Sequence, residues 1–589
     1  MRRDEVKIED KWKLEDIYET DSKWEEEYSE LAKDAERPLE YRGKLGDKAT
    51  LKEFLSLVDA LSLKAERLYG YAHMRKDEDV SNDKYVGMSD RAMSLYIALS
   101  SSLAFMEPEL SALPEEKLKE YVAAPELKEY SYMLKQILRV KAHILGEEGE
   151  KLLAMAQESL GYFQNTFSAI DNVDLPLPKV KGEDGKKVQL THGKYSFLLA
   201  SKDRSVRKGA FQGMYGAVKS LINTIATNYT GSVKHDNFYA RARGFSSPLE
   251  QALYMGDIPP EVYDNLIEHV SENLSVVHDY VRYRKEQLGG KLNMYDMYVS
   301  LVEGADLSLD FEEAFELVKK GLKPLGEDYQ KLLCRARSER WMDVYETENK
   351  RSGAYQSGCY GTHPFVLLNY SRTTHDVFTI AHELGHAMHS YYSDSALPYS
   401  QAGYAIFVAE VASTVNEVLL LKYLLGETKD VKLKKFLLSY YLDMFRTTLF
   451  RQTMFAEFEK NAHEMDLNGQ PLTPASLSDM YYELNKKYYG DGVTHNDEIR
   501  YEWARIPHFY TAFYVYKYAT GITSAVNIAN GILKDGKRVD NYKKFLSAGG
   551  TDSPYEILKI AGVDLKTAQP YEVAMKEFAD TLAQLKELK

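Results

Sequence analysis

Apolar residues recur with the period of an α-helix along most of this 589-residue chain, and no other feature restricts its fold as strongly. In residues 50–68, for example, the apolar side chains fall on one stripe of a helix, and Thr50 and Glu53 have the spacing of a capping box at its start. No repeat with a period of about 20–50 residues is visible, so a helical solenoid is not expected. The sequence therefore predicts a mostly α-helical globular protein. The same helical period runs through residues 20–35, 84–112, 148–170, 203–243, 260–287, 310–337, 405–425 and 431–463.

The helical pattern is interrupted at two places. Residues 173–191 contain two prolines followed by KVKGEDGKKVQL, which predicts a short β-hairpin turning at Glu183-Asp184-Gly185. Residues 340–373 contain three short runs rich in β-branched and aromatic residues, which predict a small sheet of about three strands. The first interruption is the best candidate for a boundary, so we expect two domains, residues 1–190 and 191–589.

The composition argues against several classes of protein. The formal charge is −14, the isoelectric point is near 5.6, and no basic stripe of the kind that binds nucleic acid is visible. No stretch approaches the ~18 apolar residues of a membrane span, and the N-terminal sequence lacks the apolar run of a secretory signal. The two cysteines, Cys334 and Cys359, are expected to be free thiols in a reducing compartment. We therefore expect a cytoplasmic protein that binds neither nucleic acid nor membranes; the pattern predicts no particular oligomeric state.

A cluster of histidines is the clearest sign of chemistry. Residues 381–390 read AHELGHAMHS, and Thr373 with Asp376 could cap a helix that runs through this stretch to about residue 393. His382 and His386 would lie on one face of that helix, one turn apart, where two imidazoles can share one metal ion. The neighbouring residues are apolar almost all round, so the helix is expected to be buried, and buried imidazoles with nothing to bind would be costly.

The other polar side chains of this motif have different expected roles. Glu383 points too far round the helix to be a comfortable third ligand, but it can reach a water on the metal and act as a general base. His389 stands where a longer zinc motif would have glycine, and Tyr392 stands where that motif would have its third ligand. We therefore expect His389 to be structural or to support a ligand.

A third metal ligand must come from elsewhere in the chain, because catalytic zinc usually has three protein ligands. The stretch YAIFVAEVASTVNEVL, residues 404–419, predicts a buried helix that carries Glu410 and Glu417 two turns apart on one face. Buried carboxylates need a partner. We expect Glu410 to bind the metal and Glu417 to hold a ligand imidazole by its other N–H, with an ordinary surface acid as the alternative for Glu417.

A histidine among several tyrosines follows at residues 505–518, RIPHFYTAFYVYKY. As a helix this segment would be unusually rich in phenols. It is either a tyrosine-rich core helix or a source of donors, His508 and tyrosine hydroxyls, that converge on a substrate carbonyl.

Five separated stretches are familiar in their sequence and order: KRSGAYQSG, AHELGHAMHSYYS, FVAEVASTVNE, LFRQTMFAEFE and IPHFYTAFYVYKYATG. Together they resemble oligoendopeptidase F, of the thimet-oligopeptidase-like zinc metallopeptidases. The opening WKLEDIYETDSKWEEEY is also similar, so the resemblance runs over nearly the whole chain.

The resemblance implies a mostly α-helical ellipsoid with a deep central channel, zinc at its base and a small β-sheet next to the zinc-binding helix. Residues 1–190 would cover the channel, and residues 191–589 would form the catalytic domain. The implied activity is that of a zinc metalloendopeptidase that cuts internal bonds of short peptides with one Zn²⁺ per chain. Carried over by motif, the zinc ligands are His382, His386 and Glu410, and the base is Glu383.

The resemblance also implies substrate contacts. The strand edge around Gly353, Ala354 and Tyr355 would flank the cleft and could pair with an extended peptide. His508 matches the family histidine, and alignment of the Tyr-x-Tyr ends makes Tyr516 the expected oxyanion donor. Tyr510 is a further candidate, whereas Tyr514 is expected to pack. The chain lacks the glycine that mammalian-type relatives have between the histidine and the tyrosines.

Two other functions were weighed against this prediction. A helical carboxypeptidase or dipeptidyl carboxypeptidase with the same histidine motif would have to grip a free C-terminal carboxylate, usually with arginine or lysine. A non-enzymatic peptide-binding or scaffold protein would have no need of Glu383. Every group that hydrolysis requires is present, so the zinc endopeptidase is the prediction.

Overall fold

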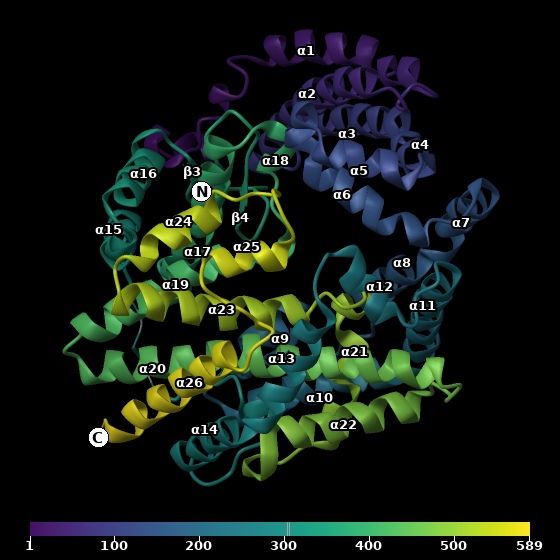
Figure 1. The fold of residues 1–589 in the computed structure, drawn as a ribbon. Helices are drawn as coiled ribbons and strands as arrows, with labels where there is room; N and C mark the ends of the chain where they lie inside the picture. Colours follow the sequence, from purple (N-terminus) through teal and green to yellow (C-terminus); the bar gives the residue numbers. More distant parts are fainter. Residues whose placement is uncertain (303, 306, 589) are drawn as a thin grey trace. The chain divides into compact units, whose positions relative to one another are not determined.

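Helices make up most of the computed structural model (Figure 1), which describes residues 1–302, 304–305 and 307–588. The strands within these residues are only two or three residues long. The predicted mostly α-helical class is therefore confirmed. None of the described helices combines the length and the apolar character that crossing a membrane requires.

Chain contacts divide the protein into two compact units, each assembled from three separate stretches. The predicted boundary near residue 190 lies inside the second of these units, and the division into residues 1–190 and 191–589 stays a prediction. Unit 1 consists of Met1–Ala142, Asp306–Gly426 and Ile528–Val563, and unit 2 consists of His143–Ala305, Glu427–Asn527 and Asp564–Lys589.

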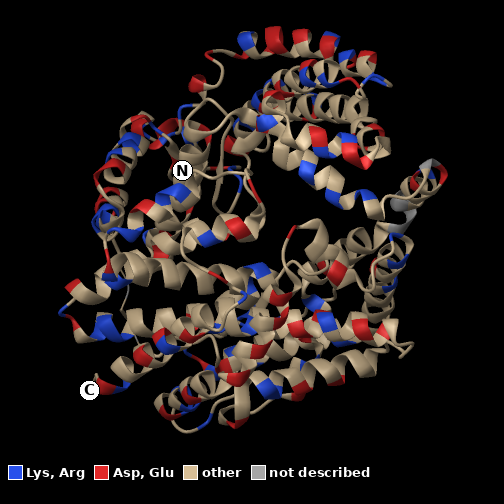
Figure 2. Ribbon diagram, in the orientation of Figure 1, with Lys and Arg blue, Asp and Glu red and all other residues tan. Residues whose placement is uncertain are grey.

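Unit 1 combines helices with a small sheet. The helices are α1 (Asp21–Asp34), α2 (Lys48–Glu78), α3 (Asp83–Leu103), α4 (Met106–Ala112), α5 (Glu115–Ala123), α6 (Ser131–Val140), α15 (Phe311–Gly321), α16 (Glu327–Ser338), α17 (Thr374–Ala396), α18 (Tyr399–Ala402), α19 (Ile406–Glu427), α24 (Arg538–Leu546) and α25 (Pro554–Ile560). Figure 2 shows basic and acidic residues interspersed along the same helices, for example along α2, so the net charge is not gathered on one element.

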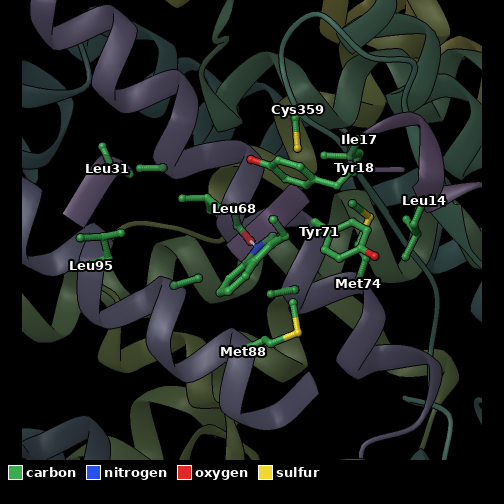
Figure 3. Packing of buried hydrophobic residues seen from close by; sticks show 14 of the residues in the cluster. Leu14, Ile17, Tyr18, Leu31, Leu68, Tyr71, Met74, Met88, Leu95 and Cys359 are labelled. Atoms are coloured by element: carbon green, nitrogen blue, oxygen red, sulfur yellow. Dashed lines mark hydrogen bonds between the residues drawn. The ribbon is translucent and has the colours of Figure 1, made fainter. Parts of the chain in front are cut away.

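The apolar stripe predicted within residues 50–68 is buried in α2, but its predicted cap is wrong. The helix begins earlier, and its N-cap is Asp47, whose carboxylate accepts a hydrogen bond from the Thr50 amide at 2.9 Å. Its C-terminal half packs into a core with the N-terminal segment and α3 (Figure 3). Leu14 and Tyr18 lie in that core beside Cys359, so residues far apart in the chain close around one apolar centre.

The predicted three-stranded sheet is confirmed in unit 1. It consists of β3 (Met342–Asp343), β4 (Tyr355–Ser357) and β5 (Phe365–Leu367), in the order β3-β5-β4. β3 runs parallel to β5, and β4 runs antiparallel to it with Tyr355 opposite Leu367. β4 and β5 pack against α17, so the sheet lies next to the helix that carries the histidine motif, as predicted.

A buried ionic cluster joins the N-terminus of the chain to this sheet. The Lys350 ammonium forms an ion pair with the Asp343 carboxylate at 2.7 Å and donates to three backbone carbonyls, at 2.5–3.2 Å. Asp343 also pairs with Arg3 at 2.7 Å, and Arg3 reaches Glu78 at 2.6 Å. Because every charge here has an opposite partner or several hydrogen bonds, the cluster can stay ionised in the core.

Unit 2 is also helical and contains the predicted β-hairpin. Its strands β1 (Lys179–Lys181) and β2 (Lys187–Gln189) pair antiparallel, and the turn includes Gly185 at a φ of 78°. The helices are α7 (Glu147–Leu160), α8 (Tyr162–Ala169), α9 (His192–Leu199), α10 (Arg204–Ser220), α11 (Ile222–Ala242), α12 (Pro248–Met255), α13 (Pro260–Glu272), α14 (Leu274–Gln287), α20 (Val431–Phe445), α21 (Arg451–Leu467), α22 (Pro474–Tyr489) and α26 (Gln569–Glu587). A further helix, α23 (Tyr516–Lys534), begins in unit 2 and ends in unit 1.

The considered helix across residues 505–518 does not form. The short 3-10 segments η12 (Asp497–Arg505) and η13 (Pro507–Tyr510) precede a bend, and α23 begins only at Tyr516. Pro507 has no amide to continue a helical ladder, and Phe513 has a φ of 57°, outside the right-handed helical region.

The buried ionic cluster gives a test of what stabilises unit 1. We expect Lys350→Met to lower the free energy of unfolding by about 3 kcal/mol, because the Asp343 carboxylate keeps only one of its two cationic partners. Thermal and denaturant unfolding measure the change. The control is Lys119→Met, which removes a solvent-exposed lysine of the same unit and should leave stability unchanged. Equal effects of the two substitutions would contradict a stabilising role for the cluster.

Candidate active site

The helix that carries the histidines begins where the sequence predicts. The Thr373 hydroxyl accepts from the Asp376 amide at 3.2 Å, and the Asp376 carboxylate accepts from the Thr373 amide at 2.9 Å. This capping box is confirmed, and α17 continues three residues beyond its predicted end, to Ala396.

The backbones of the two helices that carry the candidate ligands are in close contact. A Cβ on Gly385 of α17 would lie 2.5 Å from the Ser413 Cα of α19 and 2.8 Å from the Ala412 carbonyl oxygen. No real side chain tolerates such contacts with backbone, so only glycine permits this crossing.

A hydrogen-bond chain fixes the same crossing. The Asn416 amide of α19 donates to the Ala381 carbonyl of α17 at 3.0 Å, and the Tyr329 hydroxyl donates to the Asn416 side-chain oxygen at 3.0 Å. Asn416 is completely buried. Glu417 follows Asn416 and His382 follows Ala381, so this contact sets the register between the Glu417 carboxylate and the His382 imidazole.

The crossing brings the three predicted metal ligands together. Ligand atoms of His382, His386 and Glu410 all lie within 4.8 Å of one another, and the His382 Nε2 is 3.7 Å from a Glu410 carboxylate oxygen. Two imidazoles and one carboxylate are a donor set that Zn²⁺ uses in catalytic sites. The residues present therefore fit a zinc ion.

The His386 imidazole is already neutral, whereas the His382 imidazole would give up its Nε2 proton to a metal. Burial lowers the pKa of His386 to about 3, helped by the nearby His382, so its ring is neutral and keeps a lone pair for a metal. Burial also acts to lower the pKa of His382, but Glu417 outweighs burial and raises that pKa to about 9. The His382 Nδ1 bonds the Glu417 carboxylate, which leaves Nε2 on the side of Glu410.

Glu383 combines burial with a shifted proton affinity. Glu383 is only 7% exposed. Burial raises the pKa of Glu383 to about 7, the positive charge of His382 opposes that rise, and Glu410 and Glu417 add to it. A carboxylate with a pKa near neutrality suits a group that takes up and releases a proton.

The predicted peptide-binding edge corresponds to β4 and the residues before it. β4 is an edge strand, and the backbone amide of Gln356 hydrogen-bonds Glu383, so the edge and Glu383 are neighbours. Gly353 and Ala354 precede the strand, and Gly353 has a φ of 86°. The Tyr355 hydroxyl donates to Asp77 at 2.7 Å, so this side chain serves the core of unit 1.

His389 packs inside unit 1. Its ring is fully buried and stacks on Tyr404 with a centroid separation of 3.7 Å. Burial lowers the pKa of His389 to about 3, so the ring is neutral.

The predicted oxyanion donors His508, Tyr516 and Tyr510 belong to unit 2, where His508 contacts Tyr518 and Tyr514. The Tyr518 hydroxyl lies 3.4 Å from His508 Nε2, and the Tyr514 ring stacks on the His508 ring at 5.9 Å. Tyr516 is 2% exposed and packs against Tyr263.

Tyr510 is also a packing residue in unit 2. Its ring stacks on Phe167 at 4.6 Å and meets Tyr229 edge-on at 5.9 Å. Sequence reasoning overlooked Tyr518, Asn416, Gly385 and Gln356, because their roles arise from contacts between distant segments. Only Gly385, a glycine inside a helical motif, gave a signal that could have been noticed.

Comparison with known proteins agrees with this geometry. The sequence model of peptidase family M3 matches residues 197–577, and that of oligopeptidase F matches residues 109–176. The chain is 45% identical to oligopeptidase PepF of Bacillus subtilis, covering 100% of this chain and 88% of that protein. It is 40% identical to group B oligopeptidase PepB of Streptococcus agalactiae, covering 99% and 98%.

Solved structures are similar over the same length. Oligoendopeptidase-F from Enterococcus faecium superposes with a TM-score of 0.75 at 36% identity, covering 96% of this chain and 99% of that chain. A protein of Chlamydophila abortus superposes with a TM-score of 0.91 at 34% identity, covering 100% of both chains.

The close crossing of α17 and α19 predicts the effect of a single methyl group. We expect Gly385→Ala to separate the two helices, to reduce the zinc content well below one ion per chain and to destabilise the protein by about 1–3 kcal/mol. Elemental analysis and thermal unfolding measure the two effects.

The matched control is Gly87→Ala in α3, where a Cβ would meet open space. It should retain zinc and stabilise the protein by about 0.4–1 kcal/mol. Full zinc content in the Gly385 variant would show that the ligand cluster does not depend on this crossing.

Proposed function

Because the chain belongs to peptidase family M3, we propose that it is a zinc-dependent endopeptidase that hydrolyses internal bonds of short peptides. The family membership makes it a metallo-oligopeptidase. One observation carries the finer proposal: His382, His386 and Glu410 converge with the buried Glu383 beside them.

His382, His386 and Glu410 would hold the ion, one per chain. When bound, Zn²⁺ supplies a Lewis acid and makes a bound water acidic enough to lose a proton near neutral pH. Glu383 accepts that proton and passes it to the leaving amine, a role that its raised pKa supports. Glu417 holds the His382 ring by Nδ1, which leaves Nε2 on the side of Glu410 and available as a ligand.

The remaining groups act on the peptide. The edge of β4 binds an extended substrate through backbone hydrogen bonds, next to Glu383. His508 donates to the oxyanion together with a phenol. The contact between Tyr518 and His508 supports Tyr518 for that second donor, whereas the burial of Tyr516 and the stacking of Tyr510 support packing roles for them.

The proposed partners are short peptides, as the family membership suggests. The proposed location is the cytoplasm. The free thiols of Cys334 and Cys359 support a reducing compartment.

The endopeptidase proposal is tested with an internally quenched peptide of about ten residues whose C-terminus is amidated. We expect the wild type to cut it at an internal bond. We expect Glu383→Gln to bind one zinc per chain and to lose about 10²–10⁴-fold in kcat/KM, because the base is gone while the ligands remain. Glu427→Gln, an exposed glutamate at the end of α19, is the matched control and should behave as the wild type.

Each other outcome has a definite meaning. Cleavage of the same peptide only when its C-terminal carboxylate is free would identify a carboxypeptidase. Full activity of the Glu383 variant would remove this residue from the mechanism. A zinc-loaded wild type that cuts neither form would support the peptide-binding protein instead.

The supporting role of Glu417 gives a separate prediction. We expect Glu417→Gln to weaken zinc affinity about 10–100-fold, because the neutral amide no longer favours the proton on His382 Nδ1. Competition with a chelator measures the affinity, and Glu427→Gln again serves as the control. Unchanged affinity would assign Glu417 to structure alone.

A further inference from the structure

Unit 2 contains a small cavity, whereas the proposed zinc ligands belong to unit 1. Its volume is about 20 Å³, and its lining includes Arg446, Arg505 and the tyrosines Tyr195, Tyr215, Tyr298 and Tyr489. A site of about 10–15 Å³ is enough for one water-sized particle. The cavity therefore has room for a single atom-sized guest but not for a carboxylate or a phosphate.

One guanidinium at this cavity is buried and incompletely bonded. The Arg446 side chain is 2% exposed, and its Nε donates to the Asp443 carboxylate at 2.9 Å. Its Nη1 has no hydrogen-bond partner among the residues that the structure describes. Asp443 also accepts from the buried Arg284 at 3.3 Å, so one carboxylate serves two cations.

The second guanidinium is only partly buried, and it too is incompletely bonded. Arg505 lies over the Tyr195 ring, 5.0 Å from its centroid, and its Nε has no hydrogen-bond partner within the described part of the chain. Glu502 also lines the cavity, but it accepts from Arg451 at 2.6 Å and from the Tyr481 hydroxyl.

The region around the cavity therefore has an excess of positive charge. Four guanidinium groups, those of Arg284, Arg446, Arg451 and Arg505, have three carboxylates near them. Glu502 belongs to the lining of the cavity, whereas Asp443 and Asp171 lie outside it. Buried cations without a counter-charge are costly, so this arrangement favours a bound anion.

The phenols at the cavity are donors. Burial raises the pKa of Tyr195 and of Tyr215, and it raises the pKa of Tyr489 to about 12, so all three rings keep their protons. A neutral phenol offers an O–H to an anion, as a guanidinium offers an N–H.

We propose that this cavity binds one small monovalent anion, with chloride as the physiological ligand, through Arg446, Arg505 and the neighbouring tyrosine hydroxyls. The positive charge selects an anion, and the volume selects a monatomic one. Water is the competing occupant, and it would leave the charge excess unbalanced.

The anion would connect two segments of unit 2. Arg446 begins the π-helical turn η10 (Arg446–Phe450) that joins α20 to α21, and Arg505 ends η12. His508 follows in η13, and after burial it is Arg451 that lowers the pKa of His508. A bound anion would hold η12 against η10. Its negative charge would also offset part of the effect that the positive charge of Arg451 has on the pKa of His508. Binding itself does not depend on the proposed peptidase function.

The first experiment uses the full-length wild type in buffers of constant ionic strength, with sodium chloride or bromide exchanged for sodium gluconate. Gluconate is too large for the cavity. We expect the unfolding temperature to rise by about 2 °C with a saturable dependence on chloride or bromide, because an ion that binds only the folded state stabilises it. Equal unfolding temperatures in chloride and gluconate would overturn the proposal.

The second experiment locates the ion. Crystals grown in millimolar bromide should give an anomalous difference peak within hydrogen-bond distance of the Arg446 guanidinium. A water at that place, with bromide only on the surface, would also overturn the proposal.

A pair of matched variants assigns the effect to the cavity. Arg505→Gln removes one guanidinium from the lining and should abolish both the halide-dependent rise in unfolding temperature and the bromide peak. Arg500→Gln lies in the same segment, where its side chain pairs with Asp479 and Asp497, and should keep both. If Arg505→Gln does not fold, the wild-type titration and the bromide position still decide the proposal.

Discussion

The metal-ligand cluster depends on how closely α17 and α19 cross. His382 and His386 are one turn apart on a single helix, so any sequence that forms α17 brings them together. Glu410 joins them only because the absence of a side chain at Gly385 lets the backbone of α19 approach. Asn416 then fixes the sliding of one helix along the other by bonding a main-chain carbonyl. Imidazole and carboxylate side chains are short, so their ligand atoms can lie within 4.8 Å of one another only if the separation and the register of the two helices are fixed.

The two units contain buried charges that are balanced in different ways. In unit 1, Lys350 and Asp343 neutralise each other and use backbone carbonyls for the remaining hydrogen bonds. Around α17 two buried groups have strongly shifted pKa values. Glu417 holds a charged His382 imidazole, and burial leaves Glu383 with a pKa near neutrality. This is the pattern expected where charge is used for chemistry and not for stability. The arginine cluster of unit 2 is a third case, because its carboxylates are too few for its guanidinium groups.

Local sequence predicted the parts of the fold that short-range forces control. The capping box at Thr373, the hairpin at Gly185 and the three short strands before α17 all formed where expected. The failures were also local in origin. Asp47 takes the N-cap of α2 in place of Thr50, because its carboxylate accepts from the Thr50 amide and the helix already begins at Lys48. The tyrosine-rich segment is not a helix, because Pro507 has no amide to donate and Phe513 has a positive φ.

The sequence by itself determined how the two proposed imidazole ligands and the proposed base are spaced on α17. Histidines four apart on a helix and a glutamate between them have one geometry, set by 3.6 residues per turn. The tertiary structure decided which distant groups of unit 1 join them, the Asn416 side chain and the Gln356 backbone. Within unit 2 it decided that Tyr518 contacts His508. Periodicity within a helix is a property of the local chain, whereas the separation of two helices depends on every side chain packed between them. The separation of two helices therefore cannot be predicted from the sequence of either helix alone.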